Sequence, residues 1–379
     1  MPFKEQSIME GRQEFCAQAS KPGANVSALC RQHGISRPVG YKWLGRYGEA
    51  GLAGLTDRSR RPLHSPGRTA EELEAAVLSV RAEHPAWGAR KLARVLRDRG
   101  VCPPGRSTID DILRRHGKLD GPGAGEPRGF IRFERAAPNE LWQMDFKGHF
   151  ATGVGRCHPL TVLDDHSRYD LVLHACADER TATVQAALAS SFREHGLPDA
   201  ILCDNGPPWG DTAAHRYTPL GVWLMLHGVG VKHSRPYHPQ TMGKGERFHR
   251  TLKHELLGDG FADLAACQGA FDRWRHIYNH VRPHEALGMD TPASRYRVSP
   301  RVFREVPPPV EYDAPHVRKV SAVGRIGFLG YDLRLPNAFA GHRVALRPAD
   351  TDGCWDVFFA AFRVAQIDLR DAEDHTLQV

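Results

Sequence analysis

The chain of 379 residues carries a net charge of +7 and has a pI near 9.0. This balance favours a polyanionic partner, although merely basic proteins share it. The length leaves room for two to four domains, and the eight cysteines include no C-x-x-C pair, so neither a disulfide framework nor a zinc ribbon is indicated. The apolar run Leu220–Leu226 is too short to span a bilayer, so we expect no membrane segment and a cytoplasmic protein.

Helix-turn-helix signals dominate residues 1–55. The pattern predicts a helix over Val26–His33, a turn at Gly34-Ile35-Ser36 with Ser36 as N-cap, and a second helix over Arg37–Tyr47. The second helix would turn Val39, Trp43 and Leu44 toward the core. Its outer side would then meet DNA phosphates and base edges through Arg37, Tyr41, Lys42 and Arg46. A plain packing unit of helices with a solvated basic face is the alternative.

Residues 56–68 are polar, basic and interrupted by prolines, which is typical of an extended linker. We expect Arg58, Arg60 and Arg61 to follow a DNA backbone or groove; the alternative is a solvated hinge without fixed contacts.

A second helical group is predicted over residues 69–117, with helices at Ala70–Glu83, Trp87–Arg99 and Ser107–His116, the last started by a serine cap. Its cationic surface consists of Arg90, Arg94, Arg106, Arg114 and Arg115. Residues 118–137 follow as a flexible linker, because Gly117–Gly129 is rich in Gly and Pro and poor in apolar residues.

Three acidic residues then stand in contexts that suit a catalytic carboxylate. Asp145 follows an apolar run and reads as a strand residue. Asp204 closes the apolar run Ala200–Cys203 and precedes a turn dipeptide, which places it at the carboxyl end of a buried strand, where open α/β sheets bind ligands. Glu246 opens a basic helical segment. Any one of them alone could be a turn former, a helix cap or a salt-bridge residue, so the ordered set is what indicates a site.

Two strand-end carboxylates and one from a helix can hold two Mg²⁺ ions roughly 3.5–4 Å apart, with Mn²⁺ expected to be tolerated. Asp145, Asp204 and Glu246 would be both the catalytic and the metal-binding residues. DNA phosphates beside the ions would be held by Lys244, Arg247, His249 and Lys253. Arg282 and His284 could do the same, or could fasten the end of the domain.

Between residues 138 and 300 the predicted order is three strands, helix, strand, helix, strand, helix, which suits a mixed sheet with helices on both faces. The expected strands are Leu141–Phe150, Pro159–Asp164, Tyr169–Ala175, Ala200–Asp204 and Val231–Arg235, and the expected helices are Thr181–His195, Leu220–His227 and the Glu246 segment. Asp164 and Asp165 read as turn residues that lead into Ser167-Arg168.

Residues 301–315 form a Pro-rich linker, and the pattern changes to short alternating runs over residues 316–379. The runs are Lys319–Val323, Arg325–Phe328, Tyr331–Leu335, His342–Leu346, Trp355–Phe359 and Arg363–Ile367. So many short strands predict a small SH3-like β-barrel for DNA contact, for subunit contact, or for closing the fold.

Two long segments resemble the DDE transposase and retroviral-integrase superfamily, within it the bacterial insertion-sequence transposases with an integrase core. They are His238–Lys253, with Gly243-Lys244-Gly245-Glu246-Arg247 at its centre, and Tyr278–Gly288 continued by Thr291-Pro292-Ala293. With both aspartate contexts the resemblance covers about residues 138–298. It implies a ribonuclease-H-like catalytic core, assigns Asp145, Asp204 and Glu246 to the metal-binding acids, and likens residues 69–117 to a second helix-turn-helix domain.

The spacer between Asp204 and Glu246 is longer than the family's usual one, and the surplus is assigned to Pro207–Pro219. A loop absorbs such an insertion at little cost in closure entropy.

The chain is thus expected to be a multidomain α/β DNA transposase. It would bind the terminal inverted repeats of an insertion sequence and cleave at the ends. It would then join 3′-hydroxyl ends to target DNA as a homodimer or larger assembly, nucleoid-associated when bound to DNA. No small-molecule substrate is expected. The alternatives are a domesticated or inactive DNA-binding regulator and a structure-selective nuclease of the same fold.

Overall fold

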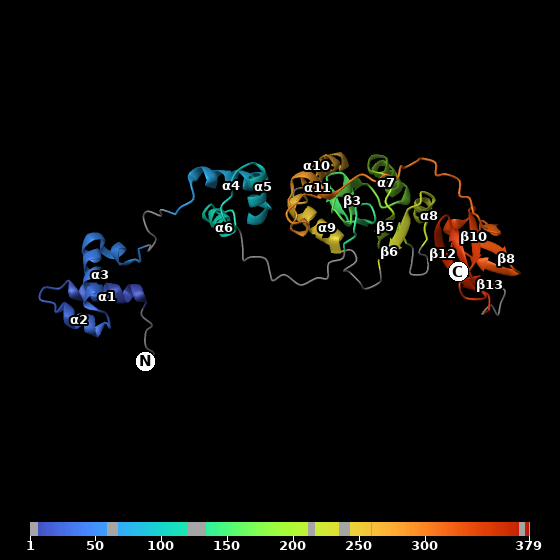
Figure 1. Ribbon diagram of the computed structural model, residues 1–379. Helices are drawn as coiled ribbons and strands as arrows, with labels where there is room; N and C mark the ends of the chain where they lie inside the picture. The colour runs from blue at the N-terminus through green and yellow to red at the C-terminus, as the bar shows by residue number, and fades with distance from the viewer. Residues whose placement is uncertain are drawn as a thin grey trace. The chain divides into compact units, whose positions relative to one another are not determined.

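The computed structural model describes residues 7–58, 67–119, 134–210, 217–234, 243–258, 260–370 and 376–378 (Figure 1). The chain divides into two compact units, Met1–Arg68 and Thr69–Val379. Within the described ranges, no helix is both long enough and apolar enough to cross a membrane. The finer domain boundaries stay predictions.

The first unit packs helices α1 (Ile8–Ala19), α2 (Val26–Gln32) and α3 (Arg37–Ala50), followed by the short 3₁₀-helix Gly51–Leu55. Its core consists of Phe15, Cys16, Cys30, Trp43 and Leu55. The turn between α2 and α3 needs Gly34, whose φ of +64° disfavours a residue with a Cβ. The predicted helix-turn-helix pair is confirmed as α2 and α3.

One helix of this unit was not predicted, and two local expectations were incomplete or wrong. The first helix, α1, carries a capping box in which Ser7 and Glu10 exchange hydrogen bonds, a signal that the periodicity of the sequence did not reveal. Ser36 occupies the N-cap of α3, but its side chain makes no capping hydrogen bond. Val39 does not face the core: it is 38% exposed, because α3 turns Gly40 and Trp43 inward instead.

The second unit begins with the helices α4 (Glu71–Glu83), α5 (Ala89–Asp98) and α6 (Arg106–Arg115). They enclose a core that includes Val77, Trp87, Leu92, Leu96 and Ile112. The expected serine cap is wrong, because α6 already begins at Arg106 with Gly105 as N-cap, so Ser107 lies within the helix.

A mixed sheet follows, built among the described residues from β1 (Trp142–Phe146), β2 (Phe150–Thr152), β3 (Gly155–Asp164), β4 (Asp170–Cys176), β5 (Ala200–Cys203) and β6 (Gly230–His233). The strand order is β2-β3-β1-β5-β6, with β4 on β3. β3 runs antiparallel to β1 and β4, whereas β1, β5 and β6 run parallel. The single strand expected over Leu141–Phe150 is divided into β1 and β2, each paired with β3.

Helices cover both faces of this sheet (Figure 1). On one face α7 (Thr181–His195) and α8 (Pro219–Leu226) pack against Trp142, Val162 and Ile201. On the other, α9 (Gly243–Glu255) and α10 (Leu264–His276) pack against Leu163 and Leu173. The predicted mixed-sheet core is therefore confirmed.

After α10 the chain makes a π-helical turn, Ile277–Val281, a 3₁₀ turn, Glu285–Leu287, and the short helix α11 (Pro292–Arg295). The π-helical turn is fastened to β4, because Asn279 accepts a hydrogen bond from the Asp170 backbone N–H and donates one to the Asp170 carbonyl, at 2.8 and 2.9 Å. Burial raises the pKa of the Asp170 carboxyl to about 8, and the nearby charge of Arg275 and the Val172 N–H only partly offset that rise.

The C-terminal region forms two small sheets around one apolar core, which includes Phe328, Leu333, Phe339, Val357 and Phe359. In one sheet the order is β12 (Phe362–Asp368), β11 (Cys354–Phe359), β10 (Arg343–Pro348) and β7 (His316–Lys319). In the other it is β13 (Thr376–Gln378), β9 (Tyr331–Arg334) and β8 (Arg325–Phe328). β13 pairs in parallel with β9 and was not expected. The first strand of the region, β7, lies earlier than the predicted Lys319–Val323.

Helix α8 belongs to two cores at once. Leu220 and Leu224 pack into the core of the mixed sheet, whereas Val222 and Met225 pack into the C-terminal core. Nearby, the Tyr217 hydroxyl donates a hydrogen bond to the Val364 carbonyl at 2.8 Å.

Replacing Asp170 by Asn should change how stability depends on pH. The folded pKa of Asp170 is about 8 against a model value of 3.8, so between these pH values the folded state holds a proton that the unfolded state has released. The contribution of the neutral acid is therefore complete below about pH 4 and is lost as pH rises through about 8. Asp170→Asn should be more stable than the parent at pH 9, by about 1 kcal/mol or more, in urea unfolding.

The exposed Asp313→Asn variant is the control for this measurement, since Asp313 lies in the linker before β7. Parallel pH profiles for the parent and Asp170→Asn would contradict the prediction.

Candidate active site

The candidate site lies where β1 and β5 run side by side. Their parallel register pairs Trp142 with Ile201 and Gln143 with Leu202. Asp145 follows Gln143 by two residues within β1, and Asp204 follows Leu202 by two residues, directly after β5 ends at Cys203. The two acids therefore lie side by side at the carboxyl end of the parallel part of the sheet. Asp145 is half-buried and Asp204 is exposed.

Glu246 reaches the same region from the first turn of α9, where it is exposed. Burial and the negative charges of Asp204 and Glu246 raise the pKa of Asp145 to about 7; the charge of Glu179 adds to the rise, and a hydrogen bond from the Phe146 N–H opposes it. Asp204 and Glu246 thus lie close enough to Asp145 to act on it electrostatically.

His249, one turn after Glu246, is held by Thr161 of β3. The Thr161 hydroxyl donates to the Asp145 carbonyl at 2.9 Å and lies 2.8 Å from His249 Nε2. Because that hydroxyl proton is already used, we assign the imidazole proton to Nε2, which leaves Nδ1 bare at 3.9 Å from Asp145 Oδ2. Burial, with the charge of Lys147, lowers the pKa of His249 to about 4, so the ring is neutral.

The loop after Asp204 is anchored before residue 211. Asp204 Oδ1 accepts a hydrogen bond from the Gly206 N–H at 3.0 Å, an Asx-type turn. Trp209 is 3% exposed and stacks on Phe146, with ring centroids 5.3 Å apart. Part of the spacer assigned to Pro207–Pro219 lies outside the described residues.

Lys244, predicted to bind a DNA phosphate, is instead engaged within the protein. Its Nζ lies 2.5 Å from Asp165 Oδ1 and donates to the Asp165 carbonyl at 3.1 Å. Burial lowers the pKa of Lys244 to about 8, although its hydrogen bond to Asp165 opposes the change. Asp165 was read from the sequence as a turn residue, yet its side chain is fully buried.

The other residues predicted to contact DNA form two groups: some lie on the protein surface, and others lie near an acidic side chain. Arg37, Tyr41 and Lys42 are exposed on α3 and Arg46 is half-buried, and exposed Arg247 and Lys253 lie on α9. Three others face acids: Arg58 lies 3.9 Å from Glu49, Arg90 3.5 Å from Glu285, and Arg106 3.8 Å from Asp110. Arg60 and Arg61 lie outside the described residues. DNA contact by any of these side chains stays a prediction.

Arg282 and His284, the two less specific candidates, are inside the protein. Arg282 pairs with Glu255 at 3.0 Å, and both side chains are almost fully buried. Burial holds the pKa of His284 far below its usual value, to about 2, so the ring is neutral. These contacts favour the alternative in which the segment fastens the end of the domain.

The donor set fits a divalent metal, although the described residues contain no preformed group of three or more His, Cys, Asp or Glu side chains that could hold an ion. Carboxylate oxygens are the ligands that Mg²⁺ prefers. Burial raises the pKa of Asp145, and the negative charges of Asp204 and Glu246 add to the rise. A bound cation would offset the repulsion that these charges contribute. Asp145, Asp204 and Glu246 are therefore suitable ligands, and His249, neutral and hydrogen-bonded to Thr161, is not a competing cation.

Sequence reasoning missed Thr161, Gln143 and the role of Asp165. Thr161 had a usable signal, because a polar residue stood inside an apolar strand run. Gln143 shares the β1 face of Asp145, two residues away.

Family models match most of the described regions. Two models described as "Integrase core domain" match residues 135–239 and 227–292, and "IS481 family transposase, C-terminal domain" matches residues 315–375. "Helix-turn-helix domain" matches residues 15–62 and "Homeodomain-like domain" residues 39–113.

Two relatives come from bacterial insertion elements. The chain is 25% identical to an IS476 protein of Xanthomonas euvesicatoria over 72% of this chain and 78% of that one. It is 26% identical to an IS407 protein of Burkholderia multivorans over 66% of this chain and 94% of that one.

Two solved structures are also similar. The HTLV-2 integrase catalytic core domain in complex with magnesium has a TM-score of 0.32 and 14% identity, over 42% of this chain and 97% of that one. A simian T-cell lymphotropic virus intasome in complex with the PP2A regulatory subunit B56 gamma has a TM-score of 0.36 and 18% identity. That match covers 75% of this chain and 96% of the other. Scores this low add nothing to the assignment.

The mixed sheet, its helices and the integrase core matches define the class: an integrase-type protein with helix-turn-helix DNA-binding domains. The C-terminal match and the insertion-element relatives narrow the assignment. Together these matches support an insertion-sequence DDE transposase with an integrase-like catalytic core.

Replacing His249 by Ala should slow DNA strand transfer about tenfold, because the Thr161 hydroxyl and the Asp145 backbone lose an orienting partner. The same change should leave the salt dependence of DNA binding unaltered, since a neutral imidazole releases no counterion. Lys253→Ala, which removes an exposed charge from the same helix, should lower the salt slope by about 1 instead. A reduced salt slope in His249→Ala would identify His249 as a phosphate contact and refute this reading.

Proposed function

We propose that this protein binds the terminal inverted repeats of an insertion sequence, cleaves at the element ends and joins the freed 3′-hydroxyls to target DNA. The observation that carries the proposal is the arrangement of Asp145 beside the end of β5, within electrostatic reach of Asp204 and Glu246. The integrase core matches and the insertion-element relatives support DNA transposition as the general activity.

The chemistry would consist of two in-line displacements at phosphorus. In cleavage, a water oxygen bonds to the phosphorus, the bond to a 3′-oxygen breaks, and the leaving oxygen takes up a proton. In joining, that 3′-hydroxyl loses its proton, its oxygen bonds to a target phosphorus, and a second 3′-oxygen leaves. Each step forms one P–O bond and breaks one, and the leaving oxygen takes up a proton for the one that the attacking water or hydroxyl loses. No oxidant or nucleotide cofactor is therefore needed.

Asp145, Asp204 and Glu246 would hold Mg²⁺, with Mn²⁺ tolerated and two ions per active site. Bound ions of this kind lower the pKa of a water or hydroxyl and neutralise charge on the phosphodiester. The contribution of the protein is to keep the three carboxylates together on β1, β5 and α9. Arg247 and Lys253, which are exposed on α9, would hold DNA phosphates beside the acids.

Recognition of the element ends would reside in the N-terminal helices. Arg37 and Lys42 on α3 are exposed and follow the turn of the helix-turn-helix pair, the position from which a recognition helix enters the major groove. Because two ends must be joined together, we propose a homodimer or larger assembly on DNA.

Changing Asp145, Asp204 or Glu246 to Ala should lower both cleavage and strand transfer by about 10³-fold or more, while binding of an element end changes little. The assay uses a labelled inverted-repeat duplex, once intact and once with a pre-cut 3′-hydroxyl end. Glu311→Ala, an exposed acid in the linker before β7, is the control and should keep full activity.

The same assay separates the alternatives. Cutting without joining by the parent protein would indicate a nuclease, and binding without either reaction would indicate a regulator. Strand transfer retained in Asp204→Ala would refute the assignment of the acids.

Changing Arg37 or Lys42 to Glu in the full chain should weaken binding of the inverted repeat about tenfold or more, because each change replaces a cation with a like charge of the phosphates. Fluorescence anisotropy at several salt concentrations measures the effect. Joining of a pre-cut end at saturating DNA should be nearly unchanged, because these residues lie in a different unit from the acids. If the variants keep their selectivity for the inverted repeat over random DNA, residues other than Arg37 and Lys42 determine the specificity.

A further inference from the structure

Asp165 makes contacts that join the strand carrying one predicted metal ligand to the helix carrying another. Its Oδ1 accepts a hydrogen bond from Gln143 Nε2 on β1 at 2.8 Å, and the same oxygen lies 2.5 Å from Lys244 Nζ on α9. Asp145 follows Gln143 by two residues, and Glu246 follows Lys244 by two residues. One carboxylate therefore contacts both elements. On each element, the contacted residue stands two positions before the acid.

The Gln143 side chain can be oriented in only one way here. Its Nε2 faces the Asp165 carboxylate, and a flipped amide would set oxygen against oxygen. Since Gln143 and Asp145 lie on the same face of β1, a fixed Gln143 side chain restrains the part of the strand from which the Asp145 side chain extends.

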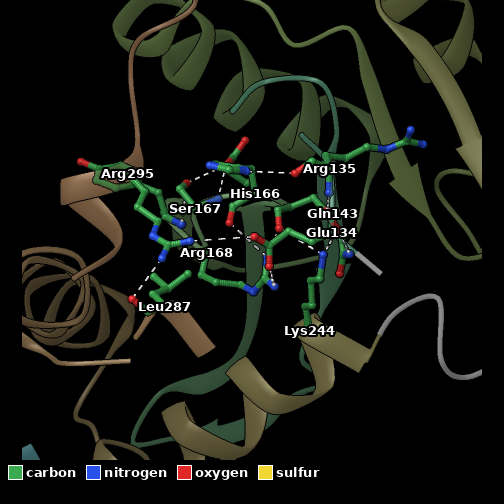
Figure 2. Close-up of polar contacts among 12 residues, drawn as sticks. Glu134, Arg135, Gln143, His166, Ser167, Arg168, Lys244, Leu287 and Arg295 are labelled. Atoms are coloured by element: carbon green, nitrogen blue, oxygen red, sulfur yellow. Dashed lines mark hydrogen bonds and ion pairs between the residues drawn. The ribbon is translucent and has the colours of Figure 1, made fainter. Parts of the chain in front are cut away.

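The turn that carries Asp165 is held by further polar contacts, which include those of Ser167 and Arg168 (Figure 2). Asp164 accepts hydrogen bonds from the Ser167 N–H and hydroxyl at 2.7 and 2.6 Å, and from the Asn139 N–H at 2.7 Å. Arg168 adopts a φ of +65°, donates to the Asp165 carbonyl, and pairs with Glu134 at 2.9 Å. A non-glycine residue in that conformation persists only where its surroundings hold it.

The Asp165 carboxylate is fully buried, yet each of its oxygens has a donor. Besides Gln143 and Lys244 on Oδ1, the Arg135 N–H donates to Oδ2 at 2.8 Å. Removing one partner of a buried ion pair leaves an uncompensated charge, which is far more costly than losing a surface pair. Lys244 is thus held firmly, and with it the first turn of α9.

We propose that Asp165 and Lys244 are positioning residues for catalysis: their ion pair, braced by Gln143, sets where Glu246 stands relative to Asp145. This inference rests on the proposed function, in which those two acids bind metal together. It assigns Lys244 a role inside the protein in place of the DNA contact suggested by its sequence context, and it assigns Asp165 a role beyond turn formation.

The test compares Asp165→Asn, Lys244→Met and the double variant in the full chain. Each single variant should lower the rate of strand transfer at saturating DNA about 10- to 100-fold, with the DNA dissociation constant and its salt slope unchanged. The double variant should be no worse than about the poorer single one, because both changes break the same link. Lys319→Met, which replaces an exposed lysine of β7 in the C-terminal region, is the matched control and should not slow the reaction at saturating DNA.

A second measurement does not depend on activity. Hydrogen exchange of the metal-free protein should be at least about tenfold faster in the first turn of α9 in both single variants, with the α10 amides unchanged. Binding of Mn²⁺, followed by electron paramagnetic resonance, should weaken in the same variants. If Asp165→Asn does not fold, Lys244→Met and Gln143→Met carry the test, and Gln143→Met should show a smaller loss because the ion pair remains.

The outcomes separate the two levels of inference. Unchanged exchange and Mn²⁺ affinity, or a salt slope lowered by about 1 in Lys244→Met alone, would overturn the positioning role and make Lys244 a phosphate contact. Failure of the proposed function itself would appear elsewhere, as strand transfer that persists in Asp145→Ala.

Discussion

Repulsion between two carboxylates on adjacent parallel strands is the constraint on which the candidate site depends. The pairing of β1 with β5 brings Asp145 and Asp204 together, and α9 adds Glu246. Left free, such groups would move apart, and burial together with the charges of Asp204 and Glu246 raises the pKa of Asp145 to about 7. The sheet opposes that separation by burying both of its faces under helices, so the strands cannot spread without exposing apolar surface.

Two basic residues of α9, His249 and Lys244, do not neutralise the acids. His249 is uncharged because it is buried, and Lys244 faces Asp165. A lysine paired directly with Asp145 would relieve the repulsion permanently and would compete with any metal for the same oxygens. The protein instead keeps its positive charge on exposed residues such as Arg247 and Lys253, which leaves the negative centre available to a cation from solution and the basic surface available to a polyanion.

Local patterns were readable from the sequence, and contacts between distant segments were not. The helix expected over Thr181–His195 has those bounds, because its apolar period is complete within one segment. The three acids were also selected from local sequence context, and their catalytic role stays a prediction. Asp165 was not, because its partners Gln143 and Lys244 lie 22 and 79 residues away along the chain. A turn residue and a buried anchor look alike until the fold brings those segments together.

The packing of α8 into two cores affects how the chain folds during synthesis. Its Leu220 and Leu224 are covered as soon as the mixed sheet forms, but Val222 and Met225 are covered by a region that begins near residue 316. At ~5–20 residues per second, the C-terminal strands leave the ribosome several seconds after α8. During that interval the nascent protein carries an apolar strip on an otherwise folded domain, so chaperone capture or premature association at this helix is a hazard of every round of translation.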